Sequence, residues 1–206
     1  MSDRGRFPAP KDGEDFSCEE ERVLRSVIAA GPGAIQLRDK GLDGARRVRR
    51  ARILLGSCRA HGVKLLVNGR VDVALAAGSD GVHLPGDGLP PADVRRILAP
   101  GAVLGRSVHG EDELDRLLAA DFVFFGPVFD TPSKRAFGPP QGLRRLARIC
   151  ALSPRPVVAV GGIGPENVAP VLDAGARGVA VIGAVLDATD PAAAVARIVE
   201  ALDRAT

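Results

Sequence analysis

Two glycine-containing segments near the C-terminus have the composition of a phosphate-binding site. Val157–Gly164 reads VVAVGGIG and Gly178–Gly183 reads GVAVIG, so each apolar run leads into glycine. Glycines directly after strands let backbone N–H groups approach a ligand closely, and the helix N-termini that follow attract anions. The same glycines would also suit tight turns that bind nothing. The phosphate-binding interpretation predicts ligand contacts from Gly161, Gly162, Ile182 and Gly183.

A second candidate for anion binding is the segment Gly126–Gly142, which reads GPVFDTPSKRAFGPPQG. Loops of this length in a compact domain are usually functional or disordered. Thr131, Ser133 and Lys134 supply hydroxyl and ammonium donors, and Lys134 is placed to close over a phosphate or pyrophosphate. The alternative is a solvated surface loop.

The segment Ala34–Lys40, AIQLRDK, combines an amide with two cations. In an extended strand, alternation puts Gln36, Arg38 and Lys40 on one side. An amide, a guanidinium and an ammonium in a row suit a heteroaromatic ring that carries an anionic group. The alternative is a salt-bridged strand end, with Asp39 as the acidic partner.

His109 follows the apolar run Val103–Ser107 and is the candidate for proton transfer. A histidine titrates near neutral pH and can both give and take a proton. A lone histidine is as often structural. His83, in the apolar stretch GVHL, is predicted to be a hydrogen-bonded residue of the core or its rim.

These residues need a scaffold of parallel strands, and the sequence predicts one. Short, near-continuous apolar runs alternate with helical patterns, which is typical of parallel strands covered on both faces. Seven strands are expected: Ala34–Arg38, Lys64–Asn68, Gly81–Leu84, Val103–Ser107, Phe122–Gly126, Val157–Val160 and Gly178–Ile182. A helix is expected after each strand, at about residues 44–60, 71–77, 92–98, 112–119, 143–152, 166–174 and 192–202.

The expected fold class is α/β, a single compact TIM (β/α)8 barrel over residues 1–206, with an open doubly wound sheet as the alternative. A first strand should precede the helix Glu19–Ala30, and the available segment is Arg6–Lys11. Its two prolines make it a weak strand, and residues 1–17 are expected to be irregular or disordered.

Composition narrows the range of partners. The net charge is +3 and the chain has no Trp or Tyr, so neither a strong basic footprint nor aromatic stacking points to nucleic acid. The arginine-rich stretch Arg46–Arg52 is interpreted as the solvated face of a helix. No apolar run reaches the roughly 18 residues of a membrane span. Three widely spaced cysteines without a CxxC motif predict reduced thiols and a cytoplasmic location.

Taken together, these segments resemble one family. IQLRDK, VNGRVDVALAAGSDGVHLP, VLGRSVHGEDEL, DFVFFGPVFDTPSK, PVVAVGGI and GARGVAVIG occur in the order of the thiamine-phosphate synthase / thiazole tautomerase (TenI) superfamily. The resemblance covers about residues 34–198. It implies a compact TIM barrel, a phosphorylated thiazole ligand and a homo-oligomer.

The resemblance leaves two enzymatic branches and one non-catalytic possibility. A synthase needs Mg²⁺ on a pyrophosphate, held by an Asp after Asn68 and another four residues after Leu84; here those positions are Gly69 and Gly88, with Asp87 one residue early. Losing two carboxylates is a serious defect in a magnesium site. Asn68-Gly69-Arg70 and the GRSVH motif resemble the tautomerase branch.

The sequence-based expectation is therefore a thiazole tautomerase, an isomerase without a cofactor. His109 would move the proton, Gln36 and Asn68 would orient the ring beside Ser107, and Arg38 or Lys40 would face the carboxylate. The alternatives are a magnesium-dependent thiamine-phosphate synthase, which would use Asp87 as a metal ligand, and a non-catalytic thiazole-phosphate-binding regulator.

Overall fold

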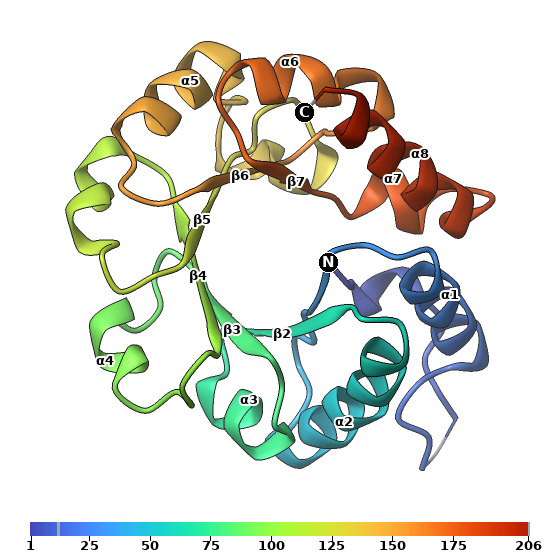
Figure 1. Ribbon diagram of the computed structural model, residues 1–206. Helices are drawn as coiled ribbons and strands as arrows, with labels where there is room; N and C mark the ends of the chain where they lie inside the picture. The colour runs from blue at the N-terminus through green and yellow to red at the C-terminus, as the bar shows by residue number, and fades with distance from the viewer. Residues whose placement is uncertain (12, 206) are drawn as a thin grey trace.

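The computed structural model describes residues 1–11 and 13–205, with the side chains of residues 116, 133, 136 and 137 left aside. Seven parallel strands form one sheet in chain order. They are β1 (Ala34–Leu37), β2 (Lys64–Asn68), β3 (Gly81–Leu84), β4 (Val103–Val108), β5 (Phe122–Phe125), β6 (Val157–Val160) and β7 (Gly178–Ala180). The sheet curls into an incomplete ring, seen along its axis in Figure 1.

Helices cover the outer face of this ring (Figure 1). The α-helices are α1 (Cys18–Ala29), α2 (Gly44–Ala60), α3 (Val71–Ala77), α4 (Pro91–Arg95), α5 (Gly142–Leu152), α6 (Val168–Asp173), α7 (Gly183–Leu186) and α8 (Pro191–Arg204). Four 3-10 turns complete the set: η1 (Arg4–Arg6), η2 (Glu111–Arg116), η3 (Pro132–Phe137) and η4 (Pro165–Asn167). None of the described helices has the length and apolar character needed to cross a bilayer.

The strands form where apolar residues run almost without interruption. Leu65, Val82, Leu104 and Val123 in the middle of their strands are completely buried. Burial on both faces is what parallel strands between helices require, and it explains why the runs do not alternate with polar residues. The predicted α/β, TIM-like architecture is confirmed.

The ring is open between β7 and β1, because no strand forms ahead of β1 in the described residues. The segment predicted as a weak first strand, Arg6–Lys11, instead begins at the last residue of η1 and continues without regular structure. Its prolines remove the N–H groups that a strand ladder needs. The first two residues bridge the mouth end of the seam: the Met1 amino group donates to Val181 O (2.9 Å) and the Ser2 N–H donates to Gln36 O (2.8 Å).

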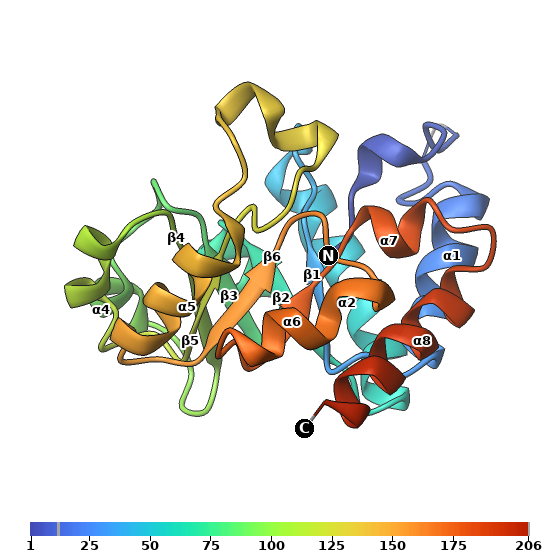
Figure 2. The same cartoon turned by 90° about the horizontal axis from the view of Figure 1, so that it is seen from above.

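Below this bridge lies a cavity of about 420 Å³, lined mainly by apolar side chains of β1, β7, α1 and α8 and of the ring interior. α1 packs against α8 and closes the outside of the seam. The N-terminal segment lies on the same side of the molecule as η3, as Figure 2 shows. The cavity is the space that an eighth strand would fill.

Two helix predictions differ from the structure. Residues 112–119 were expected to be helical, but the segment forms the shorter 3-10 turn η2 at 111–116. Residues 166–174 form η4 followed by α6 rather than one helix. Both segments are short, and a nucleus of only one or two turns gains too little from propagation to form a long α-helix.

Candidate functional site

The carboxyl ends of the seven strands meet at one end of the ring, and most predicted site residues lie there. Asn68 closes β2 and is paired in register with His83 of β3, whose own neighbour is Gly105 of β4. The glycines after β6 and β7 complete the rim. Because the strands are parallel, residues more than a hundred positions apart in the chain share one opening.

His83 lies inside the ring and is hydrogen-bonded to a predicted site residue. Its Nε2 is 2.9 Å from Ser107 Oγ, and its ring centroid is 4.2 Å from that of Phe124. Burial, together with the nearby Arg106, lowers the pKa of His83 to about 3. The imidazole is therefore neutral at physiological pH, as a buried histidine without an acidic partner should be. The prediction of a hydrogen-bonded core residue is confirmed.

The other ring nitrogen of His83, Nδ1, has no hydrogen-bond partner among the described residues. A side chain at Gly105 would collide with it, since a Cβ built there would lie 2.5 Å from Nδ1. Glycine at this position therefore lets the His83 and Phe122 rings pack directly against β4.

Gln36 has two buried polar atoms without a hydrogen-bond partner among the described residues. Its side chain is buried, it lines the cavity, and neither Oε1 nor Nε2 has a partner among the described residues. Buried polar atoms are nearly always hydrogen-bonded, so buried polar atoms without a partner mark places where a ligand or water belongs. We refer to Gln36, His83 and Ser107 as the inner cluster.

Three cations border the opening above the inner cluster. Arg38 and Lys40 follow β1, and Lys134 lies in η3 on the long loop after β5. Partial burial lowers the pKa of Lys134, and the positive charges of Arg38 and Lys40 lower it further. These three side chains therefore face a shared space, which is suited to an anion.

Asp39 is the acidic residue between the two cations of β1, but its partner is neither of them. It accepts from Arg50 Nε at 2.6 Å, and Arg50 also donates to Glu20 Oε1 at 2.6 Å. All three side chains are almost completely buried, and the Arg50 guanidinium stacks 3.8 Å from the Phe16 ring centroid. We refer to Arg50, Glu20 and Asp39 as the buried triad. It ties β1 to α1 and α2 and leaves Arg38 and Lys40 for other partners.

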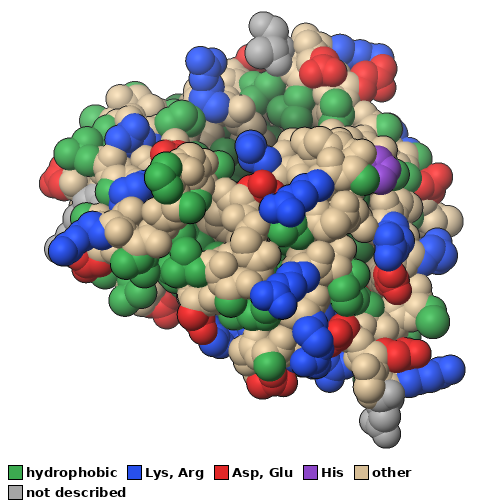
Figure 3. All heavy atoms as spheres, turned by 60° about the horizontal axis from the view of Figure 1, so that its bottom comes forward, with side chains coloured by type: hydrophobic (Ala, Val, Ile, Leu, Met, Phe, Trp, Pro, Cys, Tyr) green, Lys and Arg blue, Asp and Glu red, His purple; other side chains and the backbone are tan. Residues whose placement is uncertain are grey.

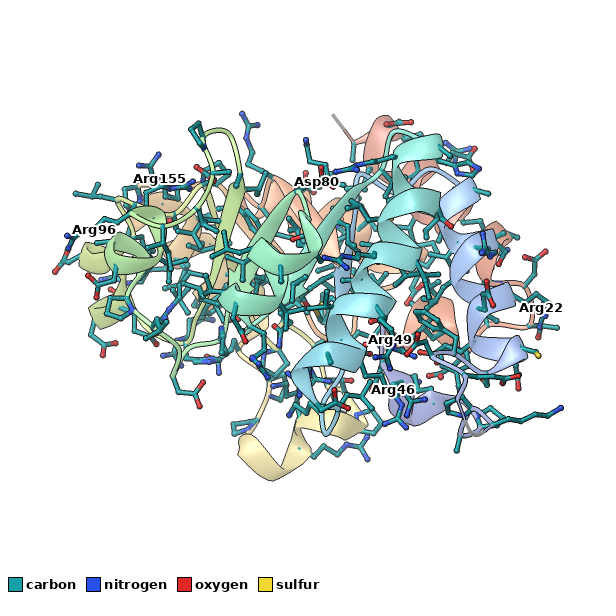
Figure 4. The ribbon with its side chains drawn as sticks, turned by 90° about the horizontal axis from the view of Figure 1, so that it is seen from below. Arg22, Arg46, Arg49, Asp80, Arg96 and Arg155 are labelled. Atoms are coloured by element: carbon teal, nitrogen blue, oxygen red, sulfur yellow. The ribbon has the colours of Figure 1, made fainter. Side chains whose placement is uncertain are left out.

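The prediction that the arginine-rich stretch of α2 is a solvated face is therefore wrong for Arg50. It is partly right for its neighbours, since Arg46 and Arg49 lie toward the N-terminal segment in Figure 4 and pair there with Asp15. Lys and Arg side chains are interspersed with Asp and Glu on the face shown in Figure 3. The stretch builds structure rather than a polyanion-binding patch.

The glycines predicted to bind phosphate are also required by packing. Gly161 and Gly162 have φ values of 99° and 65°, and a Cβ on either would lie 2.6 Å from the loop after β5. Ile182 precedes the four-residue helix α7, which begins at Gly183. The turn after β6 is thus held tightly against the loop after β5, which is compatible with either interpretation of its glycines.

Sequence reasoning missed Arg6. Its guanidinium pairs with Asp187 and lies 3.7 Å from the position of a Cβ at Gly183. The N-terminal segment thus brings a cation to the turn after β7. No local pattern could have revealed the pairing of Arg6 with Asp187, because the two residues are 181 positions apart and the N-terminal segment was predicted to be a strand.

Other predicted residues contribute less to the opening. Thr131 is half-buried just before η3, and the side chain of Ser133 lies outside the described residues. His109 is exposed, its N–H donates to Glu113 Oε1 at 2.8 Å, and its ring lies over Gly86. The structure therefore does not join His109 to the inner cluster.

A synthase implies a bound magnesium ion, and the residues present do not fit one. In the described part of the chain, no group of three or more His, Cys, Asp and Glu side chains could hold a metal. Asp87 is an exposed carboxylate, and both positions expected to carry aspartate are glycine. The ligand set does not fit a hard divalent cation.

Comparisons with known proteins identify the relatives of this chain. The family model for thiamine monophosphate synthase matches residues 11–185. The bifunctional thiamine biosynthesis protein ThiM/ThiE of Symbiobacterium thermophilum is 47% identical over 89% of this chain, which spans only 38% of that protein. The thiamine-phosphate synthase of Roseiflexus sp. is 46% identical over 84% of this chain and 76% of its own.

A solved structure, thiamine phosphate pyrophosphorylase from Pyrococcus furiosus, has a TM-score of 0.81 at 32% identity and 89% coverage of both chains. These relatives overturn the expectation of a thiazole tautomerase and isomerase, because proteins 40–46% identical to this chain are named as thiamine-phosphate synthases. Gly69 and Gly88, which favoured the tautomerase, mean that this chain lacks the aspartates of the magnesium-site pattern. They do not place the chain outside the synthase family.

The match spans most of the chain and includes all seven described strands. The phosphate-type turns, the cations after β1 and the polar interior all lie within the matched residues. The chain belongs to the thiamine monophosphate synthase family.

Proposed function

We propose that this chain is a transferase that joins a pyrimidine methyl pyrophosphate to a thiazole phosphate, giving thiamine phosphate and pyrophosphate. The observation that carries the proposal is the arrangement of the opening. The orphaned Gln36 amide and His83 Nδ1 lie inside the ring, and cations flank the opening from β1, η3 and the N-terminal segment. Two phosphorylated heterocycles need such an opening, with anionic ends at the rim and rings inside.

In this reaction the thiazole nitrogen forms a bond to the methylene carbon of the pyrimidine while the bond from that carbon to the pyrophosphate oxygen breaks. The pyrophosphate leaves with the electron pair. Arg38, Lys40 and Lys134 would stabilise the growing negative charge, which is the kind of interaction that lowers a barrier most.

The inner cluster would hold the pyrimidine. The Gln36 amide offers both a donor and an acceptor to ring nitrogens and an exocyclic amine. A neutral His83 adds hydrogen bonding without placing a positive charge beside a methylene carbon that becomes electron-poor. No proton needs to be transferred for the coupling, so the exposed position of His109 is no obstacle.

The test is to incubate the purified full chain with both substrates and magnesium, and to quantify thiamine phosphate and released pyrophosphate. We expect equimolar products, and a loss of kcat/KM of about 10- to 100-fold in Arg38→Ala, as charge-assisted hydrogen bonds of this type are worth. Arg59→Ala, at the other end of α2, is the matched control. Absence of thiamine phosphate from the unmodified chain would refute the proposal.

A further inference from the structure

The two turns in which a synthase would place its magnesium carboxylates are built without them. Gly69 follows β2 with a φ of 71°, and its N–H donates to His83 O at 2.8 Å. Gly88 follows β3, and its N–H donates to Pro85 O at 2.9 Å. Both turns are thus ordered by backbone hydrogen bonds and need no metal to define their shape.

Arginine side chains occupy the surroundings of both turns. Arg106 donates to the carbonyl oxygens of Gly88 (3.1 Å) and Leu89 (3.0 Å) and also to Gly86 O. Carbonyl oxygens of this loop would otherwise be available as hard ligands. A guanidinium bound to them keeps a permanent positive charge where a divalent cation would have to sit, and the two repel each other.

Two carboxylates near these turns, Asp72 and Asp87, are respectively ion-paired and exposed. Asp72 forms a two-pronged ion pair with Arg70, whose Nε donates to Oδ1 at 2.8 Å. This pair lowers the pKa of Asp72 to about 2. Asp87 is exposed, and a single exposed carboxylate is a poor ligand set for Mg²⁺.

Positive charge is instead supplied by residues that follow β1 and by η3. Arg38, Lys40 and Lys134 approach one another closely enough for the first two to disfavour the charged form of the third. Cations that repel each other in the empty site gain most from a polyanion placed between them. η3, which contains Lys134, rises above the strand ends in Figure 2.

We infer that the turns after β2 and β3 cannot hold a magnesium ion on protein carboxylates, so that this chain binds the pyrophosphate group of its substrate without one. The choice of pyrophosphate as the ligand rests on the proposed function. The disagreement between the residues present and a metal site rests on the structure alone.

The experiment is calorimetric titration of the full chain with inorganic pyrophosphate, once in EDTA and once with magnesium chloride. We expect binding in EDTA, with a Kd no more than about threefold weaker than in magnesium, because the contacts come from side chains. Lys134→Ala should weaken binding in EDTA by about tenfold or more. Lys64→Ala, which removes the same charge at the amino end of β2, is the matched control and should bind like the unmodified chain.

Asp87→Asn tests the competing explanation. If binding occurs only with magnesium and Asp87→Asn abolishes it, Asp87 is a metal ligand and the inference is wrong. Absence of binding in both buffers also overturns it. Unchanged binding by Asp87→Asn in both buffers supports it.

Turnover separates this inference from the proposed function. Thiamine phosphate formed only in magnesium would overturn the inference and leave the proposed function intact. Pyrophosphate binding in EDTA without formation of thiamine phosphate in any buffer would refute the proposed function and leave the anion site standing.

Discussion

The buried triad and the inner cluster are both polar groups inside an apolar protein, but they differ in how completely the protein satisfies them. Arg50 donates to two carboxylates and to the carbonyl of Asp15, and its guanidinium stacks on the Phe16 ring. The inner cluster leaves both polar atoms of Gln36 and one of His83 without a described partner.

This difference separates polar residues that build the fold from polar residues that await a ligand. A buried charge is tolerable only when it is paired, so the triad must be complete in the folded chain itself. A binding site must do the opposite and keep hydrogen-bonding capacity in reserve at a cost in stability. In this chain the fully paired ionic groups lie beside β1, and the unpaired Gln36 amide lies within β1.

The largest effect is expected from breaking the triad. Arg50→Met should lower the free energy of unfolding by about 3–5 kcal/mol, because Glu20 and Asp39 would remain buried and unpaired. Urea unfolding followed by circular dichroism measures the loss. A change below 1 kcal/mol would show that the two carboxylates gain protons or water at little cost, and the contrast with the inner cluster would fail.

The next effect is a pH dependence that comes from His83. Its pKa is about 3 in the folded chain against the ordinary value of 6.5, so the unfolded chain binds a proton between these limits and the folded chain does not. Stability from this group is fully present above pH 6.5 and is lost as the pH falls toward 3. The loss amounts to a few kcal/mol, at about 1.4 kcal/mol per pKa unit.

Measurement of unfolding free energy against pH in the unmodified chain and in His83→Gln isolates this contribution. The variant should lose less stability on acidification over the same range, since glutamine does not titrate. Parallel curves for the two chains would mean that His83 is hydrated or protonated in the folded state.

A smaller and opposite effect on stability is expected at Gln36. Gln36→Leu should leave the free energy of unfolding unchanged or raise it by about 1 kcal/mol, because it removes a buried amide without partners. The same change should reduce formation of thiamine phosphate by at least about tenfold. Thermal unfolding and initial rates, measured on one preparation, test both halves. A clear destabilisation would show that the amide is already satisfied within the fold.

The smallest effect is expected at Arg49, which neighbours Arg50 in the chain but pairs with Asp15 at the surface. Arg49→Ala should cost less than about 1 kcal/mol, as surface ion pairs do. Thermal unfolding at low and high salt measures it. A loss as large as that of Arg50→Met would mean that the whole arginine stretch, and not the triad, holds the N-terminal segment in place.

Much of this molecule can be predicted from local sequence. β2, β3 and β6 begin and end where their apolar runs do, and α2 and α3 match the helical patterns. Such elements are decided by short-range periodicity and by glycine and proline at their ends. The clustering of Gln36, Arg38, Lys40 and the glycine turns at one opening also followed, because parallel strands place their carboxyl ends together.

Other features depend on contacts between distant parts of the chain. Whether an arginine of α2 is solvated or buried depends on Glu20 and Asp39, which lie on α1 and at the end of β1. Three further features depend on such distant contacts. His109 lies apart from His83, Arg6 approaches the turn after β7, and Arg106 donates to the Gly88 carbonyl.

The sequence by itself therefore determined the alternating α/β architecture, the cations and glycines of the opening, and the lack of aspartate at residues 69 and 88. Only the tertiary structure decided that Asp39 pairs with Arg50, that the ring stays open at its seam, and that the Gln36 amide is left without a partner. The reason is physical: strand and helix formation are governed by neighbours in the chain, whereas pairing and burial of polar groups are governed by neighbours in space.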